Sequence, residues 1–296
     1  MNPTADKRSG NLGRLPERLS GPLTFLCLCI ALLGCQGAET PEVLSPNEPP
    51  AVFGGGARSI PLLWHNPTGH HISVPISLEL WQVQSSIAMP LGDVPWKELQ
   101  VLPGQTVLES AAIEVPVVRA QTRFLARWVD ARSEILGVSE FVAYPTNLLR
   151  ELQVLGGPDP VGVYDPTDQL KPLLSLAGVE YTDLQEEGFD RHYGRLLIVG
   201  PFNLANPQPG WLATAIQSRA RKGAAVVWVT SAQEDPALLT PSFFSVSIGK
   251  GVVIVAEPSL IKDLAQNPRS QLRLVELCRI AITRRVPLLP SILSNR

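Results

Sequence analysis

The sequence has no excess of positive charge. Its 25 lysines and arginines are offset by 27 aspartates and glutamates, which gives a formal net charge of −2. A general nucleic-acid binder needs a basic face that displaces counterions from phosphates. The composition therefore excludes a general DNA- or RNA-binding role, and no nucleic-acid partner is expected.

Long apolar runs and cysteines are also scarce. The apolar run at residues 22–33 is shorter than the roughly 20 residues that a membrane-spanning helix needs. Three of the four cysteines lie within the first 35 residues, and only Cys278 lies beyond them. One remaining cysteine excludes an intramolecular disulfide in the rest of the chain. We expect Cys278 to be a small apolar side chain on the buried face of a helix.

What is present begins with a leader. Four basic residues precede the apolar run: Lys7, Arg8, Arg14 and Arg18. A basic region, an apolar region and a terminal small residue, here Gly34, are typical of a secretory signal. The junction Leu32-Leu33-Gly34-Cys35 resembles the lipobox of bacterial lipoproteins. That resemblance implies that the Cys35 thiol receives diacylglycerol, that cleavage occurs before Cys35, and that acyl chains such as palmitate hold the protein to the membrane. An ordinary cleaved signal peptide with a chance cysteine is the alternative.

The remaining sequence changes character twice. Residues 36–58 contain four prolines and a triple glycine without hydrophobic periodicity, which predicts a flexible tether. The 28 prolines of the chain exclude a coiled coil or a long helical bundle. The predicted segments are a lipoprotein signal peptide (1–34), a flexible tether (35–58), a β-sandwich domain (59–148), an amidotransferase-like α/β domain (149–288) and a C-terminal tail (289–296).

A period of two runs through residues 59–148. In ISVPISLELWQV it places Ile72, Val74, Ile76, Leu78 and Leu80 on one face. Turn sequences such as NPTG and LPGQ separate such runs, as in an all-β sandwich. We expect Trp64, Trp81 and Trp128 to pack in its core. The stretch resembles immunoglobulin-like accessory domains of secreted proteins, without the cysteine pair of antibody folds.

Residues 149–288 alternate apolar runs with helical patterns. The runs VGVY, RLLIVG, AAVVWVT and GVVIVAE are continuous apolar strands, and DQLKPLLSLAG and WLATAIQSRARKG have helical periodicity. Continuous apolar strands indicate a parallel sheet covered on both faces. The predicted fold class is thus α/β plus all-β: an immunoglobulin-like β-sandwich followed by a doubly wound, mainly parallel α/β domain.

Ligands of such sheets bind beyond the carboxyl ends of the strands. The candidate ligand-binding residues at this edge are Asp165, Asn203, Thr230, Ser231 and Glu257. Structural roles compete with this reading: Asp165-Pro166 starts a turn, Asp168 suits a helix N-cap, and Ser231 with Glu234 forms a capping-box pattern. Arg219, Arg221 and Lys222 end a helix, where positive charge complements the dipole.

The second domain resembles class I glutamine amidotransferase-like and flavodoxin-like folds over about 135 residues, through RLLIVGP, WLATAIQSRARKGAAVVWVTS and IGKGVVIVAEP. Catalytic members carry a cysteine on a glycine-flanked elbow, activated by a histidine. Here the elbow reads Thr230-Ser231-Ala232-Gln233, and no histidine lies near Glu257 in the sequence. The resemblance therefore implies a catalytically silent relative with no catalytic residue, which leans against an enzyme.

No metal or cofactor is predicted. The histidines of HNPTGHH, which are His65, His70 and His71, lie in a turn that supplies no second shell for a metal, and His192 is expected on a surface loop.

These observations predict a membrane-anchored envelope lipoprotein that acts as a non-catalytic binding or assembly component. Its folded part would lie outside the cytoplasm, on the periplasmic side or the cell surface, with the membrane and an envelope protein as partners. Two alternatives stay open: an envelope hydrolase that uses Ser231, and an accessory subunit of an envelope transport system.

Overall fold

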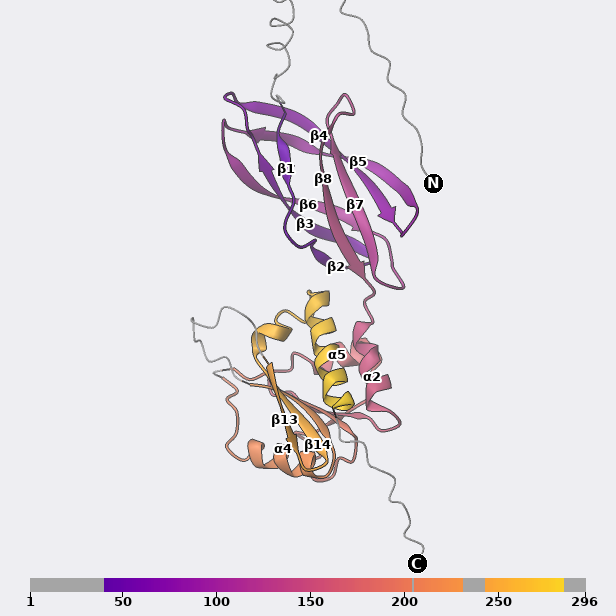
Figure 1. Ribbon diagram of the computed structural model, residues 1–296, viewed down its shortest axis with the longest axis vertical. Coiled ribbons are helices and arrows are strands. Elements are labelled where there is room, and N and C mark those ends of the chain that lie inside the picture. The colour runs from indigo at the N-terminus through magenta and orange to yellow at the C-terminus, as the bar shows by residue number, and fades with distance from the viewer. Residues whose placement is uncertain (1–39, 204, 231–242, 285–296) are drawn as a thin grey trace, which may run out of the picture. The chain divides into compact units, whose positions relative to one another are not determined.

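The computed structural model describes residues 40–203, 205–230 and 243–284. The chain forms two compact units, Met1–Thr40 and Pro41–Arg296, and all elements described below belong to the second unit. In the described part, fourteen strands form three sheets, joined by four α-helices and two short 3-10 helices (Figure 1). Within this part, no helix is both long enough and apolar enough to span a bilayer.

Two of the sheets enclose one hydrophobic core. Their strand orders are β2-β8-β7-β4-β5 and β1-β3-β6. The strands are β1 (Glu42–Leu44), β2 (Ala51–Phe53), β3 (Gly56–His65), β4 (Ile72–Val83), β5 (Ala88–Val101), β6 (Thr106–Val115), β7 (Thr122–Val129) and β8 (Ile135–Tyr144). Alternate side chains of β4 point into the core, so the apolar face predicted for residues 72–80 is confirmed.

Three tryptophans fill the middle of this core. The ring centroid of Trp96 lies 6.2 Å from that of Trp64 and 5.1 Å from that of Trp128, and Trp64 and Trp128 are 6.0 Å apart. Trp64 and Trp128 are fully buried, as expected from the sequence. Trp128 Nε1 donates a hydrogen bond of 2.9 Å to the Ser139 hydroxyl, which satisfies its one polar atom inside the core.

The segment expected to be a flexible tether carries two strands. Strand β1 pairs antiparallel with β3, from Glu42 opposite His65, and β2 pairs parallel with β8. The Val43 side chain packs on the core, and the Phe53 side chain is buried. The prolines lie between or before these strands, where no ladder hydrogen bond is required of them. The prediction of a flexible tether was wrong for these strands. Proline content indicates where strand pairing stops and not whether pairing occurs.

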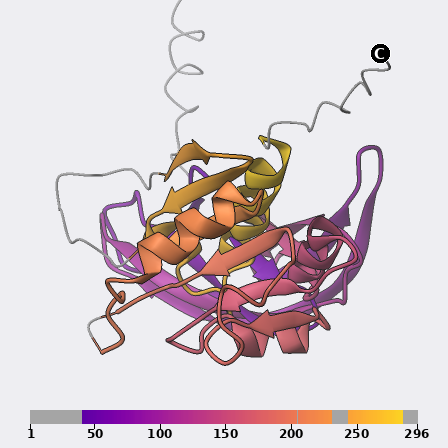
Figure 2. The same cartoon turned by 90° about the horizontal axis from the view of Figure 1, so that it is seen from below.

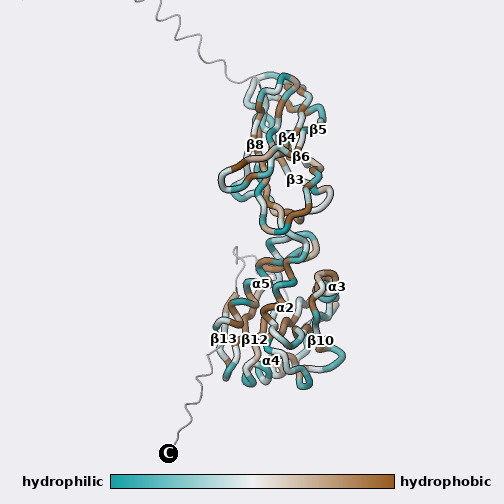
Figure 3. The backbone as a smooth tube through the Cα atoms, turned by 90° about the vertical axis from the view of Figure 1, so that its right-hand side faces the viewer, coloured by the Kyte–Doolittle hydropathy of each residue, from teal (hydrophilic) through white to brown (hydrophobic). Residues whose placement is uncertain are grey.

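The third sheet has six strands in the order β10-β9-β11-β12-β14-β13. They are β9 (Val161–Tyr164), β10 (Tyr181–Asp183), β11 (Leu196–Val199), β12 (Ala225–Val229), β13 (Phe243–Ile248) and β14 (Gly251–Ala256). Five strands are parallel, and β13 pairs antiparallel with β14 at one edge. Every residue of β9 and β11 is buried, which matches their continuous apolar sequence (Figure 3 colours hydrophobic backbone brown).

Few helices pack against this sheet. They are η1 (Leu148–Arg150), α2 (Glu151–Gly156), α3 (Lys171–Leu176), α4 (Leu212–Arg221), η2 (Pro258–Ile261) and α5 (Pro268–Thr283). One core cluster joins the sheet to α2, α3 and α5, and a second joins it to α4. Figure 2 shows α4 in orange as the helix beside the gold strands of the sheet. Cys278 of α5 is fully buried, as predicted.

The predicted fold class, an immunoglobulin-like β-sandwich followed by a doubly wound, mainly parallel α/β domain, is wrong. The described chain is mostly β-structure in three sheets with few helices, and no clear doubly wound domain is present. No helix lies between β10 and β11 in the described chain, and the hairpin strand β13 precedes β14. Continuous apolar strands report burial on both faces, and they do not report how many crossovers contain a helix.

We predict that Gly137→Ala destabilises the fold through β1. A Cβ atom built at Gly137 would lie 2.6 Å from Val43 Cβ, so overpacking should lower the free energy of unfolding by about 1–3 kcal/mol. Chemical denaturation measures this change. Gly69→Ala is the matched control, because a Cβ there meets no atom within 4 Å. Equal stability of the two variants would contradict the docking of β1 on β8.

Candidate functional site

The strand register aligns the carboxyl ends of the parallel strands. Tyr164 pairs with Val199, Val199 with Trp228, and Val229 with Ala256. The residues that follow, Asp165, Thr230 and Glu257, therefore lie at one edge of the sheet, and Asn203 lies in the loop after β11. Ser231 lies outside the described residues. The hydrogen bonds of each described side chain indicate its role at this edge.

Asp165 has a structural role. Its side chain is fully buried, and its carboxylate accepts hydrogen bonds from Leu170 N (2.6 Å), Lys171 N (3.0 Å) and the Thr167 hydroxyl (3.1 Å). It thereby satisfies amides at the start of α3, whose own N-cap residue makes no side-chain cap. Asp168, the cap suggested by the sequence, instead has a positive φ of 51° and an exposed side chain that forms an ion pair with Lys171.

The other described edge residues also bond locally. Asn203 Oδ1 accepts from Asn206 N at 2.7 Å, which closes a short turn. The Thr230 hydroxyl donates to the Ala256 carbonyl at 3.4 Å, across to the end of β14. Glu257 precedes η2, and one of its carboxylate oxygens accepts from the Ser259 hydroxyl at 3.5 Å. Thr230 therefore joins the ends of β12 and β14, whereas the Asn203 and Glu257 bonds shape the loops that follow their strands.

The groups that carry nucleophilic chemistry are withdrawn from solvent. Complete burial raises the pKa of the Cys278 thiol far above its usual range, so the thiolate does not form at neutral pH. His192 is 3% exposed, which corrects the expectation of a surface loop. Its imidazole packs over Gly162 of β9, and burial, followed by the charge of Arg219, lowers its pKa.

The histidine-rich turn is organised by a residue that the sequence reading did not single out. Asn66 is fully buried; its side-chain amide donates to the carbonyls of His70 (2.8 Å) and Val101 (3.0 Å), and its Oδ1 accepts from Thr68 N (2.9 Å). His70 and His71 are exposed. Among the residues that the structure describes, no group of three or more histidine, cysteine, aspartate or glutamate side chains is arranged to hold a metal.

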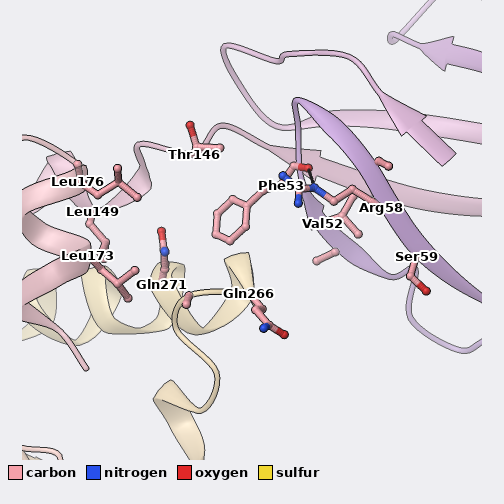
Figure 4. A pocket seen from close by; sticks show the side chains of 14 residues that line it. Val52, Phe53, Arg58, Ser59, Thr146, Leu149, Leu173, Leu176, Gln266 and Gln271 are labelled. Carbon is pink, nitrogen blue, oxygen red and sulfur yellow. Dashed lines mark hydrogen bonds between the residues drawn. The ribbon is translucent and has the colours of Figure 1, made fainter. Parts of the chain in front are cut away.

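A cavity of about 550 Å³, here called the Phe53 cavity, is lined by none of the candidate edge residues that the structure describes. Its apolar wall includes Phe53, Leu149, Leu173 and Leu176. Figure 4 shows the Gln271 side chain rising from α5 toward Phe53 and Leu149. No alternation pattern marks this cavity in the sequence, because its lining comes from β2, η1, α3 and α5, which are distant along the chain.

Two polar side chains give the Phe53 cavity its chemistry. Gln271 is 4% exposed; its Nε2 donates to the Leu264 carbonyl at 2.8 Å, and its Oε1 has no partner in the described part of the chain. The Arg58 guanidinium donates to the carbonyls of Phe53 (2.7 Å) and Gly55 (3.1 Å). A small amphipathic group, apolar on one side and with a donor for Gln271 on the other, matches this lining.

No protein-family model and no curated protein matches this sequence. Solved structures resemble parts of it. The alkylpurine DNA glycosylase AlkC of Pseudomonas fluorescens is 13% identical with a TM-score of 0.27 over 38% of this chain and 33% of its own. The sporulation control protein Spo0M of Bacillus subtilis is 12% identical with a TM-score of 0.27 over 40% and 56%. A Niemann-Pick type C2 protein from Japanese carpenter ant is 10% identical with a TM-score of 0.28 over 37% and 96%. Likenesses this weak assign neither a family nor a function.

We predict that Asp165→Ala lowers the free energy of unfolding by about 1–3 kcal/mol, because two buried amides at the start of α3 lose their acceptor. Chemical denaturation followed by circular dichroism measures the change. Asp168→Asn is the control: its side chain is 77% exposed, so a change within about 0.5 kcal/mol is expected. If both variants keep wild-type stability, the carboxylate of Asp165 is not needed for folding. That outcome would favour a ligand-binding role for Asp165 instead.

His192 predicts a pH dependence of stability. Its pKa is lowered in the folded state, so below the unfolded value near 6.5 the unfolded chain takes up a proton that the folded chain does not. The free energy of unfolding should therefore fall between pH 7.5 and 5.5, by at most about 1.4 kcal/mol per pH unit from this group. Denaturation of His192→Gln should show a shallower slope, and His71→Gln, at an exposed position, should keep the wild-type slope. A wild-type slope in His192→Gln would refute this assignment.

Proposed function

We propose that this protein is a lipid-anchored envelope lipoprotein that acts as a non-catalytic binding or assembly component. The observation that carries the proposal is the junction Leu32-Leu33-Gly34-Cys35 at the end of a short apolar run preceded by basic residues. An apolar run of this length is too short to span a bilayer. Acyl chains on Cys35 would therefore supply the membrane attachment.

The position of β1 limits the reach of such an anchor. Strand β1 begins at Glu42, so residues 36–41 are the whole connection between Cys35 and the first strand. An extended chain spans at most about 3.6 Å per residue, which limits this connection to about 20 Å. Strand β1 would accordingly start close to the membrane surface and not at the end of a long tether.

The described side chains support binding over catalysis. The carboxylate of Asp165 and the hydroxyl of Thr230 are engaged in bonds that hold the strand ends, and the Cys278 thiol is buried in its protonated form. The Phe53 cavity, with its apolar wall and the unpartnered Gln271 Oε1, suits a small amphipathic group of a ligand or partner. The hydrolase alternative depends on Ser231, which lies outside the described residues, and no observation favours it or the transport-subunit alternative.

We predict that Cys35→Ala blocks processing or releases the protein from membranes, because the substitution removes the acceptor sulfur. Membrane fractionation, together with the mass of the N-terminal peptide, measures attachment and acylation. The control is Cys29→Ala, within the apolar run, which should be processed and retained like the wild type. Unchanged processing and membrane association of Cys35→Ala would contradict acylation.

The number of free thiols gives a second measurement of Cys35 acylation. In the acylated mature protein the sulfur of Cys35 is a thioether, so Cys278 is the only thiol left. In detergent, a thiol reagent should label nothing in the folded protein, because Cys278 is fully buried, and a single site after denaturation. A second labelled cysteine in the denatured mature protein would show that Cys35 is not acylated.

A further inference from the structure

A second cavity, here called the basic cavity, lies at the end of α4 away from the strand edge. Its volume is about 210 Å³, and its lining includes three basic residues: Arg195, Arg219 and Lys222. Arg195 directly precedes β11, Arg219 lies in the last turn of α4, and Lys222 is the C-cap residue of that helix. The remaining lining is the backbone and small side chains of Gly194, Gly223 and Ala224, with Tyr193 at the exposed rim.

Arg219 is buried to an unusual degree for a charged side chain. It is 5% exposed, its Nε has no partner in the described chain, and Nη2 donates one long hydrogen bond of 3.4 Å to the Gly194 carbonyl. Burial lowers its pKa, against the favourable charge of Asp190. A buried guanidinium is destabilising unless it is paired and hydrogen-bonded. A role in complementing the helix dipole does not explain this burial, because that role is served at the surface.

The protein itself offers this cation little compensation. In the described part of the chain, no carboxylate oxygen lies within 4.0 Å of a side-chain nitrogen of Arg195, Arg219 or Lys222. The carbonyls that end α4 are already bonded: Lys222 N donates to Ser218 O, and Ala224 N donates to Arg219 O. They are therefore poor substitutes for an anion.

The neighbouring side chains hold the basic cavity in shape. The Arg195 guanidinium donates to the Leu155 carbonyl at 2.9 Å and to the Val154 carbonyl at 3.4 Å, which orients it from α2. His192 packs so closely on Gly194 that a Cβ there would lie 2.5 Å from Nε2. Its Nε2 has no partner in the described residues, and the positive charge of Arg219 helps to keep the ring neutral. The Arg195 guanidinium is thus positioned before any ligand arrives.

We propose that the basic cavity binds a small oxyanion, a phosphate group carried either by inorganic phosphate or by a phosphate monoester. A guanidinium matches two oxygens of such a group, and an ammonium adds a point charge. The volume of the basic cavity leaves space for the oxyanion with several waters, each of which occupies about 30 Å³ in the liquid. Binding would give Arg219 a directly contacting counter-charge, for which the described chain offers no ion pair, so it would also stabilise the fold.

The test uses the full-length mature lipoprotein in detergent. Calorimetry and thermal unfolding are measured while inorganic phosphate is added, with chloride adjusted so that the ionic strength stays constant. We expect saturable binding and a rise in the unfolding temperature that follows the occupancy of the site. No saturable binding of phosphate, or equal stabilisation by chloride, would overturn the proposal.

Variants locate the binding. Lys222→Gln alters an exposed side chain and should fold, and it should weaken phosphate binding by about three- to tenfold through the loss of one charged contact. Arg219→Gln should abolish binding. If Arg219→Gln does not fold, Arg195→Gln provides the second variant, with weakened binding expected. Arg221→Gln is the matched control: it removes a positive charge from the same helix end but does not line the basic cavity. Equal affinity in Lys222→Gln and Arg221→Gln would refute the assignment.

A competition arm distinguishes the two sources of the phosphate group. Dihexanoyl phosphatidic acid, kept below its micelle concentration, presents a phosphate monoester on a lipid. If the lipid competes with inorganic phosphate and binds more tightly than phosphate does, the site is assigned to a lipid headgroup. If the lipid competes but binds more weakly, the site is assigned to free phosphate. Binding that does not compete with phosphate, or whose affinity is unchanged in Lys222→Gln, would place the lipid elsewhere and count against the monoester half of the proposal.

Discussion

Strands β9 and β11 are buried on both faces along their whole length, and this burial controls what the rest of the six-stranded sheet does. Two-sided burial leaves few positions for polar side chains within these strands, and Asp165, Thr230 and Glu257 instead follow the strand ends. At the carboxyl edge the displaced groups bond to each other and to the backbone. Asp165 organises α3, and Thr230 joins β12 to β14.

Two further polar side chains are buried near the opposite, amino-terminal edge of the six-stranded sheet. His192 and Arg219 are both buried, and Gly162 and Gly194 let the imidazole of His192 approach the backbone closely. Each retains a nitrogen without a partner in the described residues. Polar atoms that are buried and unsatisfied are uncommon in folded proteins and call for a physical explanation. An oxyanion in the basic cavity supplies one for Arg219.

In the other two sheets, the tryptophan core and strands β1 and β2 depend on each other. Trp64, Trp96 and Trp128 fill the space between the sheets, and Val43 and Val52 extend that packing into the proline-containing segment that carries β1 and β2. A segment with many prolines thereby becomes part of the fold.

Sequence patterns alone predicted local features well. The inward face of β4, the burial of Cys278 and the positions of the main apolar strands followed from periodicity and hydrophobicity, because these properties depend on neighbouring residues. The Phe53 cavity and the basic cavity had no such signal. Their lining residues are up to about 220 positions apart in the Phe53 cavity, as Phe53 and Gln271 illustrate.

The sequence by itself determined which segments are buried strands, since this property is written in contiguous residues. Only the tertiary structure decided that proline-rich residues 42–53 pair into sheets, that His192 is covered, and that few crossovers contain helices. The physical reason is that burial and pairing are joint properties of distant segments. The same histidine or arginine is a solvated surface group or a buried, incompletely paired one, according to which backbone lies against it.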